Sequence, residues 1–289
     1  MDPTKENAGK VALVLEGGSL RDQFTAGVLD VFMENGITVD ACYGVSAGSI
    51  VGLSFKSRQI GRYCRDNLAF CRDSRYMGGR AVLESKSVIG YDFYINEIQN
   101  RSDPIDNETY LANPMPLYAT VTDMTFGTPA YLNVQNAELD IVYVQASTSM
   151  PLLTPPVEIN DRLYMDGGIA DSVPVEHVLD EVGFERAVVV LTQHREYVKE
   201  PYDFLPTART VYAKYPYFVQ ALETRHERYN EQRGHIWAYE DEGRALVIAP
   251  PQPVEVETME RDAQKLLELY VEGRQEGKRR LAEVQEFIG

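Results

Sequence analysis

The sequence predicts an α/β protein in which a mainly parallel sheet is wrapped by helices. Short apolar runs suited to strands alternate along the chain with segments of helical periodicity, which is typical of such a sheet. A Gly-x-Ser-x-Gly pentapeptide, Gly44 to Gly48, lies where one of these runs gives way to a helical segment. With 289 residues, of which 44% are hydrophobic, the chain is long enough for one large core, and we expect a single domain.

The amino-terminal elements follow the order strand, helix, strand, helix. Residues 11–15 form an unbroken apolar run that predicts the first strand, and residues 25–35 predict a helix that ends at Gly36. Residues 42–45 predict the second strand, and residues 47–56 predict the helix that follows the serine turn. The pentapeptide therefore connects the second strand to its helix.

A long irregular segment interrupts this alternation. Residues 57–113 are polar and aromatic, with helical fragments near 60–70 and 91–98, and we interpret them as an insertion or a lid over the sheet. We expect the whole chain, 1–289, to be one domain whose catalytic core, residues 8–195, contains this insertion.

Further strands are predicted in the second half of the core. Residues 114–122 and 129–134 flank a Phe-Gly-Thr turn at 126–128 and predict paired strands. Residues 141–146 and 187–192 are short, nearly unbroken apolar runs that suit buried parallel strands.

The carboxyl-terminal part, residues 196–289, is predicted to be a helical extension that packs on the core. A linker-like break at 201–206 precedes a basic and aromatic helical stretch at 207–232. Residues 258–287 carry an apolar and small-residue stripe at helical spacing, which predicts a docking face. The stripe consists of Ala263, Leu266, Tyr270, Gly273, Gly277, Leu281 and Val284.

Composition and charge exclude several classes of protein. The net charge of −16 argues against a nucleic-acid partner and predicts long-range repulsion from anionic membranes, so any transient membrane-surface contact must be local and apolar. The three cysteines, Cys42, Cys64 and Cys71, lack metal-ligand spacing and predict buried thiols rather than a metal site or a disulfide framework. The polar residues 1–10 and the lack of an apolar stretch of about 18 residues predict a cytoplasmic protein.

Three glycine turns supply the parts of an acyl-transfer site. Ser46 lies at a strand-to-helix turn that exposes its hydroxyl and places it at the positive end of the following helix. Gly17-Gly18-Ser19 follows the first strand, and its backbone N–H groups can stabilise an oxyanion. Asp166-Gly167-Gly168 follows another hydrophobic stretch and supplies a carboxylate. Because adjacent parallel strands bring their carboxyl ends to one edge, we expect the first two turns to lie side by side.

The general base is either a histidine or Asp166. The chain offers His177, His194, His226 and His235, and a histidine is the usual base for a serine nucleophile. An aspartate, with an ordinary pKa of about 3.9, needs burial to raise that pKa before it is an efficient base. Ser46 follows only the second strand, whereas the serine of Ser-His-Asp hydrolases follows several strands, and this counts against a triad.

The set of motifs resembles the patatin-like phospholipases, serine acyl hydrolases that use a Ser-Asp dyad without histidine. The resemblance rests on Gly17, Gly18 and Arg21, on the turn around Ser46, and on Asp166-Gly167-Gly168. The stretch from Ala146-Ser147 to Pro151 supports it, and the match extends over residues 11–192.

The resemblance implies a fold, an activity and roles for individual residues. It implies a three-layer α/β/α sandwich related to the cytosolic phospholipase A2 catalytic domain, and cleavage of lipid acyl esters without metal or other cofactor. Ser46 would be the nucleophile and Asp166 its base, with Gly17, Gly18 and the N–H of Ser19 as the oxyanion hole. The residues implied to support these loops are Arg21, Gly44, Gly48, Gly167 and Gly168.

Two departures from the family pattern keep alternatives open. The family turn reads Gly-Gly-Gly-x-Arg-Gly, whereas this chain has Ser19 and Asp22 in place of the third and last glycines. We expect Asp22 to cap the following helix, with Arg21 screening its charge. The alternatives to a dyad hydrolase are a lipid-binding homologue with weakened turnover and a serine esterase that depends on His177 or His194. The sequence leaves the oligomeric state open.

Two features near residues 207–232 have more than one interpretation. Arg225 and His226 suit either a surface ion pair or a phosphate head group, and the ion pair is the expected role. The aromatic residues there suit core packing and a lipid interface equally. These are Tyr212, Tyr215, Tyr217 and Phe218.

Overall fold

The computed structural model describes residue 7 and residues 9–289 and contains an eight-stranded mixed sheet. The strand order is β5-β6-β3-β2-β1-β7-β8, with β4 paired to β3. The strands are β1 (Val11–Leu15), β2 (Ala41–Val45), β3 (Leu117–Asp123), β4 (Thr128–Asn133), β5 (Val157–Ile159), β6 (Arg162–Asp166), β7 (Arg186–Val190) and β8 (Ala245–Ile248). Most of residues 1–10, on which the prediction of a cytoplasmic protein partly depends, lie outside the described residues.

The helices surround this sheet. Those of the first half are η1 (Ser19–Asp22), α2 (Gln23–Glu34), α3 (Ala47–Lys56), α4 (Arg62–Phe70), α5 (Gly79–Ser85), α6 (Tyr91–Phe93), η2 (Tyr94–Ser102) and α7 (Asn107–Ala112). Those of the second half are α8 (Ile141–Ser147), η3 (Gly167–Ile169), η4 (His177–Glu181), α9 (Leu205–Val211), α10 (Pro216–Glu223), α11 (Arg225–Asp241) and α12 (Ala263–Ile288).

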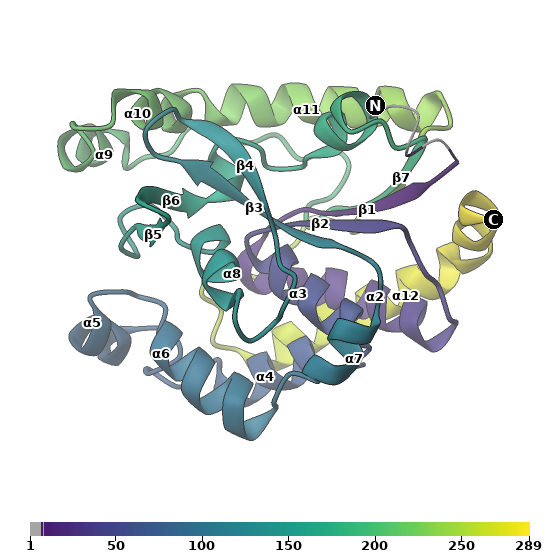
Figure 1. The fold of residues 1–289 in the computed structure, drawn as a ribbon, viewed down its shortest axis with the longest axis horizontal. Helices are drawn as coiled ribbons and strands as arrows, with labels where there is room; N and C mark the ends of the chain where they lie inside the picture. The colour runs from purple at the N-terminus through teal and green to yellow at the C-terminus, as the bar shows by residue number, and fades with distance from the viewer. Residues whose placement is uncertain (1–6, 8) are drawn as a thin grey trace.

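Five adjacent strands, β3, β2, β1, β7 and β8, are parallel, and the mainly parallel sheet that the sequence predicts is confirmed. Side chains of β1 alternate between two cores, because successive residues of a strand face opposite sides of the sheet. Leu13 and Leu15 pack in the core that contains residues of α2, α3 and α12, whereas Ala12 and Val14 pack with residues of η4 and α11. Figure 1 shows the resulting layers, with α9 to α11 above the sheet and α2, α3 and α12 below it. The predicted three-layer α/β/α architecture is confirmed.

The carboxyl-terminal stripe docks as predicted, and its main partner is a helix. Leu266 and Val284 of α12 are buried in the core that lies below the sheet. A Cβ at Gly273 would lie 2.1 Å from the Phe24 carbonyl oxygen of α2, and one at Gly27 would lie 2.2 Å from the Tyr270 carbonyl oxygen. The two backbones therefore touch through glycines, as only residues without a side chain allow.

The irregular segment 57–113 forms α4 to α7. These helices lie on the side of the α2–α3–α12 layer that faces away from the sheet (Figure 1). Whether the segment moves as a lid stays a prediction.

The strand predicted at residues 141–146 is wrong, because these residues form helix α8. A short apolar run suits a buried strand and a buried helix alike. Here tertiary packing decides: Val144 and Ala146 are buried against the sheet, and the Ser147 hydroxyl donates to the Thr120 carbonyl oxygen of β3 at 2.7 Å. The sequence analysis also missed β5 and β8, which are only three and four residues long.

No helix in the described part of the chain is both long enough and apolar enough to cross a membrane.

Candidate active site

The strand register brings Ser46 and Asp166 together. Val45, the last residue of β2, pairs with Thr120 of β3, and the next β3 residue, Val121, pairs with Asp166 of the antiparallel strand β6. The Ser46 Oγ donates to Asp166 Oδ2 at 2.7 Å, although the two residues are 120 positions apart. The first glycine turn lies at the same edge, because Leu15 at the end of β1 pairs with Gly44 of β2.

Ser46 has a backbone conformation that few non-glycine residues adopt. Its φ of 52° and ψ of −127° place it at a sharp turn immediately before α3. Its amide donates to the Ser147 Oγ at 2.9 Å, which fixes the turn to helix α8. Gly44 packs against Ser49, and Gly48 packs against the Leu15 carbonyl oxygen. Such strain is held only where the surrounding contacts determine the backbone, and it exposes the hydroxyl at the sheet edge.

The Asp166 carboxylate is 8% exposed and is held from two sides. Its Oδ1 accepts from the Gly168 amide at 2.8 Å, and its Oδ2 accepts from Ser46. Burial raises the pKa of Asp166 above its ordinary value, while the hydrogen bonds from Ser46 and Gly168 act in the opposite direction. Gly167 faces the Thr120 carbonyl oxygen, which leaves no room for a side chain. The carboxylate is therefore positioned to accept the serine proton.

The first glycine turn lies against the serine. A Cβ at Gly17 would lie 2.6 Å from the Ser46 Cβ, so the close approach of the two turns requires glycine there. Ser19 has a φ of 53°, and its hydroxyl donates to the Thr258 carbonyl oxygen at 2.7 Å. The amide of Ser19 begins a helical turn, where an N–H has no intrahelical acceptor.

The expectation that the Asp22 side chain caps helix α2 is wrong. Asp22 is fully buried and stands at the start of α2, but its Oδ2 accepts from the Gly18 amide at 2.5 Å and not from the helix. Burial raises the pKa of Asp22 well above its ordinary value. The carboxyl points toward Gly18, four residues earlier, because the Gly18 amide needs a hydrogen-bond acceptor at a site that water does not reach. One predicted oxyanion donor is therefore already hydrogen-bonded.

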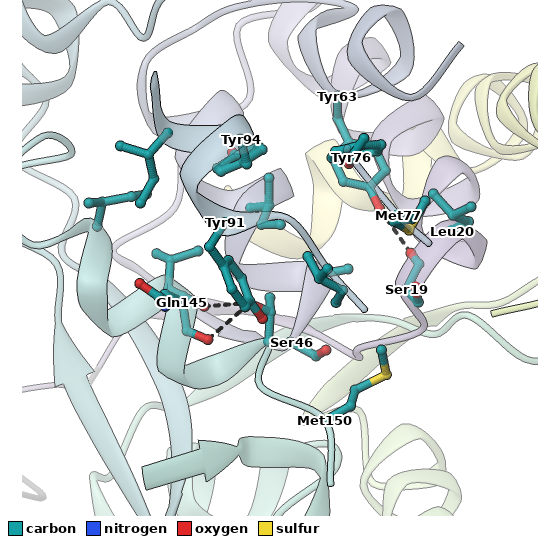
Figure 2. A pocket seen from close by; sticks show the side chains of 17 residues that line it. Ser19, Leu20, Ser46, Tyr63, Tyr76, Met77, Tyr91, Tyr94, Gln145 and Met150 are labelled. Atoms are coloured by element: carbon teal, nitrogen blue, oxygen red, sulfur yellow. Dashed lines mark hydrogen bonds between the residues drawn. The ribbon is translucent and has the colours of Figure 1, made fainter. Parts of the chain in front are cut away.

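Ser46 lies between two cavities of opposite character. The first, about 60 Å³ in volume, is apolar and extends from Ser46 toward the segment 57–113. Figure 2 shows Tyr63, Tyr76 and Tyr91 in its wall, with Met150 on the other side of Ser46. Tyr91 exchanges a hydrogen bond with the Thr148 hydroxyl at 3.0 Å, and Tyr63 donates to the Ser19 carbonyl oxygen at 2.9 Å. The phenol groups of Tyr63 and Tyr91 are thus engaged with protein atoms, and the cavity lining is mainly apolar.

The second cavity is larger, about 370 Å³, and polar. Ser46, Asp166 and the turn from Gly17 to Ser19 form one side of it. Arg21, Lys199 and Arg225 also line it. An acyl ester with its carbonyl at Ser46 would place its chain in the apolar cavity and its polar part here.

The family assignment agrees with this geometry. A family model described as patatin-like phospholipase matches residues 13–179, which include Ser46 and Asp166. The chain belongs to the patatin-like phospholipase family. A second model, described as a domain of unknown function (DUF6363), matches residues 215–289.

The relatives of this patatin-like chain include characterised and uncharacterised proteins. The lysophospholipase NTE1 of Cryptococcus neoformans is 29% identical over 190 residues, which cover 63% of this chain and 11% of that relative. The uncharacterized protein YjjU of Escherichia coli is 25% identical over 287 residues, 97% of this chain and 79% of YjjU. The crystal structure of VipD from Legionella pneumophila gives a TM-score of 0.46 at 12% identity, over 95% of this chain and 67% of VipD. This chain therefore spans a small fraction of the NTE1 relative.

No histidine among the residues that the structure describes lines either cavity beside Ser46 of this patatin-like protein. His177 stacks on Tyr131 with ring centroids 3.6 Å apart and pairs with Glu181. His194 follows β7, but its neighbour Gln193 is the residue that lines the polar cavity. The three cysteines are free and buried, and the described residues hold no group of three or more metal-ligating side chains.

Two interpretations of the carboxyl-terminal helices change. Arg225 does not form the expected surface ion pair; its Nε donates to the Gly168 carbonyl oxygen beside Asp166. Of the aromatic residues, Tyr212 and Phe218 are buried in the core formed by α9 and α10, whereas Tyr217 is exposed. Sequence reasoning missed Lys199 as a site residue because it lies in no motif. It used Ser147 only as part of the stretch from Ala146 to Pro151, and the hydrogen bond that Ser147 accepts from Ser46 appears only in the folded chain.

Proposed function

We propose that this protein is a serine acyl-ester hydrolase that acts on lipids through a Ser46–Asp166 dyad. The observation that carries the proposal is the 2.7 Å hydrogen bond from the Ser46 Oγ to Asp166 Oδ2, between an apolar and a polar cavity. Membership of the patatin-like phospholipase family and the lysophospholipase name of the NTE1 relative support a lipid ester as the substrate.

In the proposed reaction, Asp166 transfers protons from the nucleophile to the leaving group. Asp166 takes the hydroxyl proton while the Ser46 oxygen attacks the ester carbonyl carbon, and the negative charge forms on the carbonyl oxygen. The amides of Gly17 and Ser19 stabilise that charge, because the Gly18 amide already donates to Asp22. Asp166 then returns the proton to the leaving alcohol as the ester C–O bond breaks, which leaves the acyl group on Ser46. Asp166 next takes a proton from the water that attacks the acyl carbon, and it passes that proton to the Ser46 oxygen as the fatty acid leaves.

Two substitutions test the dyad. We expect Ser46→Ala and Asp166→Asn each to lower kcat/KM for a p-nitrophenyl ester by about a thousandfold or more, on the scale of losses of a nucleophile or base. Circular dichroism would verify that both variants fold. Full activity of Asp166→Asn would reject the dyad.

The histidine variants are the matched controls. His177→Ala and His194→Ala should retain most of the activity, because neither residue borders the cavities beside Ser46. Complete loss of activity in either variant, with the fold intact, would favour the histidine-dependent esterase instead.

A second candidate function is lipid binding with weak turnover, and one contact favours it. The buried Asp22 carboxyl accepts from the Gly18 amide, so an ester oxyanion would compete for that donor. A fluorophosphonate probe distinguishes the two candidates. Labelling of Ser46 in the folded wild type supports the hydrolase, and failure to label supports the binding protein.

A further inference from the structure

The polar cavity beside Ser46 contains cationic side chains that have no carboxylate partner. In a chain of net charge −16, many arginines elsewhere are paired with carboxylates: Arg209 lies 2.5 Å from Glu223, and Arg244 lies 2.9 Å from Asp180. Lys199 and Arg225, by contrast, form no ion pair with any residue in 7 and 9–289. Two unpaired cations in one cavity of an acidic protein indicate a site for an anion.

Lys199 is held in place by its backbone and by aromatic rings. Its amide donates to the Asn230 Oδ1 of α11 at 2.8 Å, and the Asn230 side-chain amide donates back to the Lys199 carbonyl oxygen at 3.0 Å. Its Nζ lies 4.1 Å from the ring centroid of Tyr229 and 5.5 Å from that of Tyr197. The ammonium group is thus fixed over aromatic faces, with its hydrogen-bond donors free for a ligand in the cavity.

Arg225 is held in a similar way from the first turn of α11. Its Nε donates to the Gly168 carbonyl oxygen, and its guanidinium lies 4.9 Å from the ring centroid of Tyr202. The hydrogen bond to Gly168 uses one of the five N–H donors of arginine. The remaining donors suit an anion with several oxygens, such as a phosphate.

The carboxylates that line the cavity are already engaged with other protein groups. Glu16 borders the cavity and is buried, but its Oε1 accepts from the Tyr229 hydroxyl at 2.5 Å and its Oε2 accepts from the Thr192 amide at 2.7 Å. Arg21 lines the same cavity, and its buried Nε has no partner in the part of the chain that the structure describes. Asp166, the other carboxylate that lines this cavity, accepts from Ser46 and Gly168, so neither carboxylate forms an ion pair with these cations.

We propose that Lys199 and Arg225 bind the phosphate of a single-chain acyl lipid whose chain occupies the apolar cavity. The polar cavity, at about 370 Å³, accommodates a phosphate and glycerol, and Ser46 lies where the two cavities meet. This inference rests on the proposed function, because it assigns recognition of the substrate phosphate at the same site to Lys199 and Arg225.

Binding to an inactive variant tests the site without turnover. In a Ser46→Ala protein, calorimetry would compare octanoyl-glycerol 3-phosphate, octanoylglycerol and glycerol 3-phosphate. We expect the phosphate-bearing lipid to bind at least tenfold more tightly than octanoylglycerol, and glycerol 3-phosphate to bind more weakly than the lipid. Equal affinity for the two lipids would overturn the proposal. Equal affinity for glycerol 3-phosphate and the phosphate-bearing lipid would overturn a lipid source for the anion.

Variants of Lys199 test whether the preference for the phosphate-bearing lipid arises at this site. Adding Lys199→Met to the Ser46→Ala protein should remove the tenfold preference for the phosphate-bearing lipid. Lys199→Arg keeps the positive charge and should retain the preference, which would show that the charge is responsible. Lys214→Met, at an exposed lysine outside both cavities, is the matched control and should leave all three affinities unchanged. An unchanged preference in Lys199→Met would overturn the assignment.

The pH dependence gives a second readout. Burial, with Arg225, Arg21 and Arg233 nearby, lowers the pKa of Lys199 to about 7, and Glu16 opposes this shift. Lys199 is protonated below that pH and loses its charge above it. Affinity for the phosphate-bearing lipid should therefore fall between pH 7.5 and 9.5, and Lys199→Arg should abolish the fall. A pH-independent affinity in the Lys199 protein would count against the site.

The two proposals fail separately. If wild type does not cleave esters but Ser46→Ala keeps its lysine-dependent preference for phosphate, the hydrolase proposal is wrong and the anion site stands. If esters are cleaved and no preference exists, the anion site is wrong and the hydrolase stands.

Discussion

At the scale of single residues, the site depends on groups held in unfavourable states. Ser46 keeps a strained backbone, and Asp166 is a carboxylate buried at 8% exposure. Both costs serve the proposed reaction, because the strain exposes the hydroxyl and the burial makes the carboxylate a stronger base.

The pH dependence of kcat/KM reports the ionisation of the Asp166 carboxyl. Because burial raises the pKa of Asp166, the base is protonated and inactive at pH values where an ordinary aspartate is still ionised. We expect kcat/KM to fall as pH decreases through a value above about 3.9, the ordinary aspartate pKa. The charge of Lys199 lowers the pKa of Asp166, so Lys199→Met should move this limb to higher pH, whereas Lys214→Met should not. A limb at or below the ordinary value would contradict a buried base.

Stability measurements separate the effect of the backbone strain at Ser46 from the effect of its hydroxyl. Ser46→Ala and Ser46→Gly both remove the hydrogen bond to Asp166, but only glycine adopts a φ of 52° without strain. We expect Ser46→Gly to be more stable than Ser46→Ala by about 1 kcal/mol, at the lower end of the usual cost of such strain. Urea denaturation of the two variants measures the difference. Equal stability would show that the turn is not strained.

At the scale of elements, the contact between α2 and α12 joins the two ends of the chain. The helices approach closely at Gly27 and Gly273. Through this contact α12 packs in the same layer as α3, the helix that follows Ser46. The division into a catalytic core at 8–195 and an extension at 196–289 stays a prediction. The extension nevertheless contributes Lys199 and Arg225 to the polar cavity.

Two glycine substitutions test this packing. Gly273→Val should lower the free energy of unfolding by about 3 kcal/mol or more, because its side chain would meet the α2 backbone at 2.1 Å. Gly234→Ala, at an exposed position of α11 with nothing within 4 Å of the new Cβ, should instead raise it by about 0.5–1 kcal/mol. Chemical denaturation measures both. A Gly273→Val protein as stable as wild type would reject the close contact.

At the scale of the whole molecule, the negative net charge of the chain contrasts with the cations gathered in the polar cavity. The chain carries a net charge of −16, whereas three cationic side chains, Arg21, Lys199 and Arg225, line the polar cavity beside the carboxylates of Glu16 and Asp166. The surface field therefore repels anionic membranes at long range, and the cavity attracts an anionic group that has already entered. This combination favours single lipid molecules as substrates over an anionic bilayer surface.

Salt dependence tests the surface field. Binding to phosphatidylserine vesicles should be weak at 10 mM NaCl and should increase at 150 mM, because the Debye length falls from about 30 Å to about 8 Å. Binding to phosphatidylcholine vesicles is the control and should change little. Co-sedimentation measures both. Tight binding to the anionic vesicles at low salt would reject the predicted repulsion.

The amino-acid sequence by itself determined the fold class and the two turns that meet. Apolar runs fix which segments become parallel strands, and small residues at Gly17 and Gly44 to Gly48 permit the sharp turns, since both are local properties of the chain. The run at 141–146 shows the limit, because its periodicity fits a strand as well as the helix it forms. Only the tertiary structure decided the Asp22–Gly18 contact, the two cavities and the positions of Lys199 and Arg225. Burial and charge at a site depend on which distant segments pack around it, and no local pattern records that.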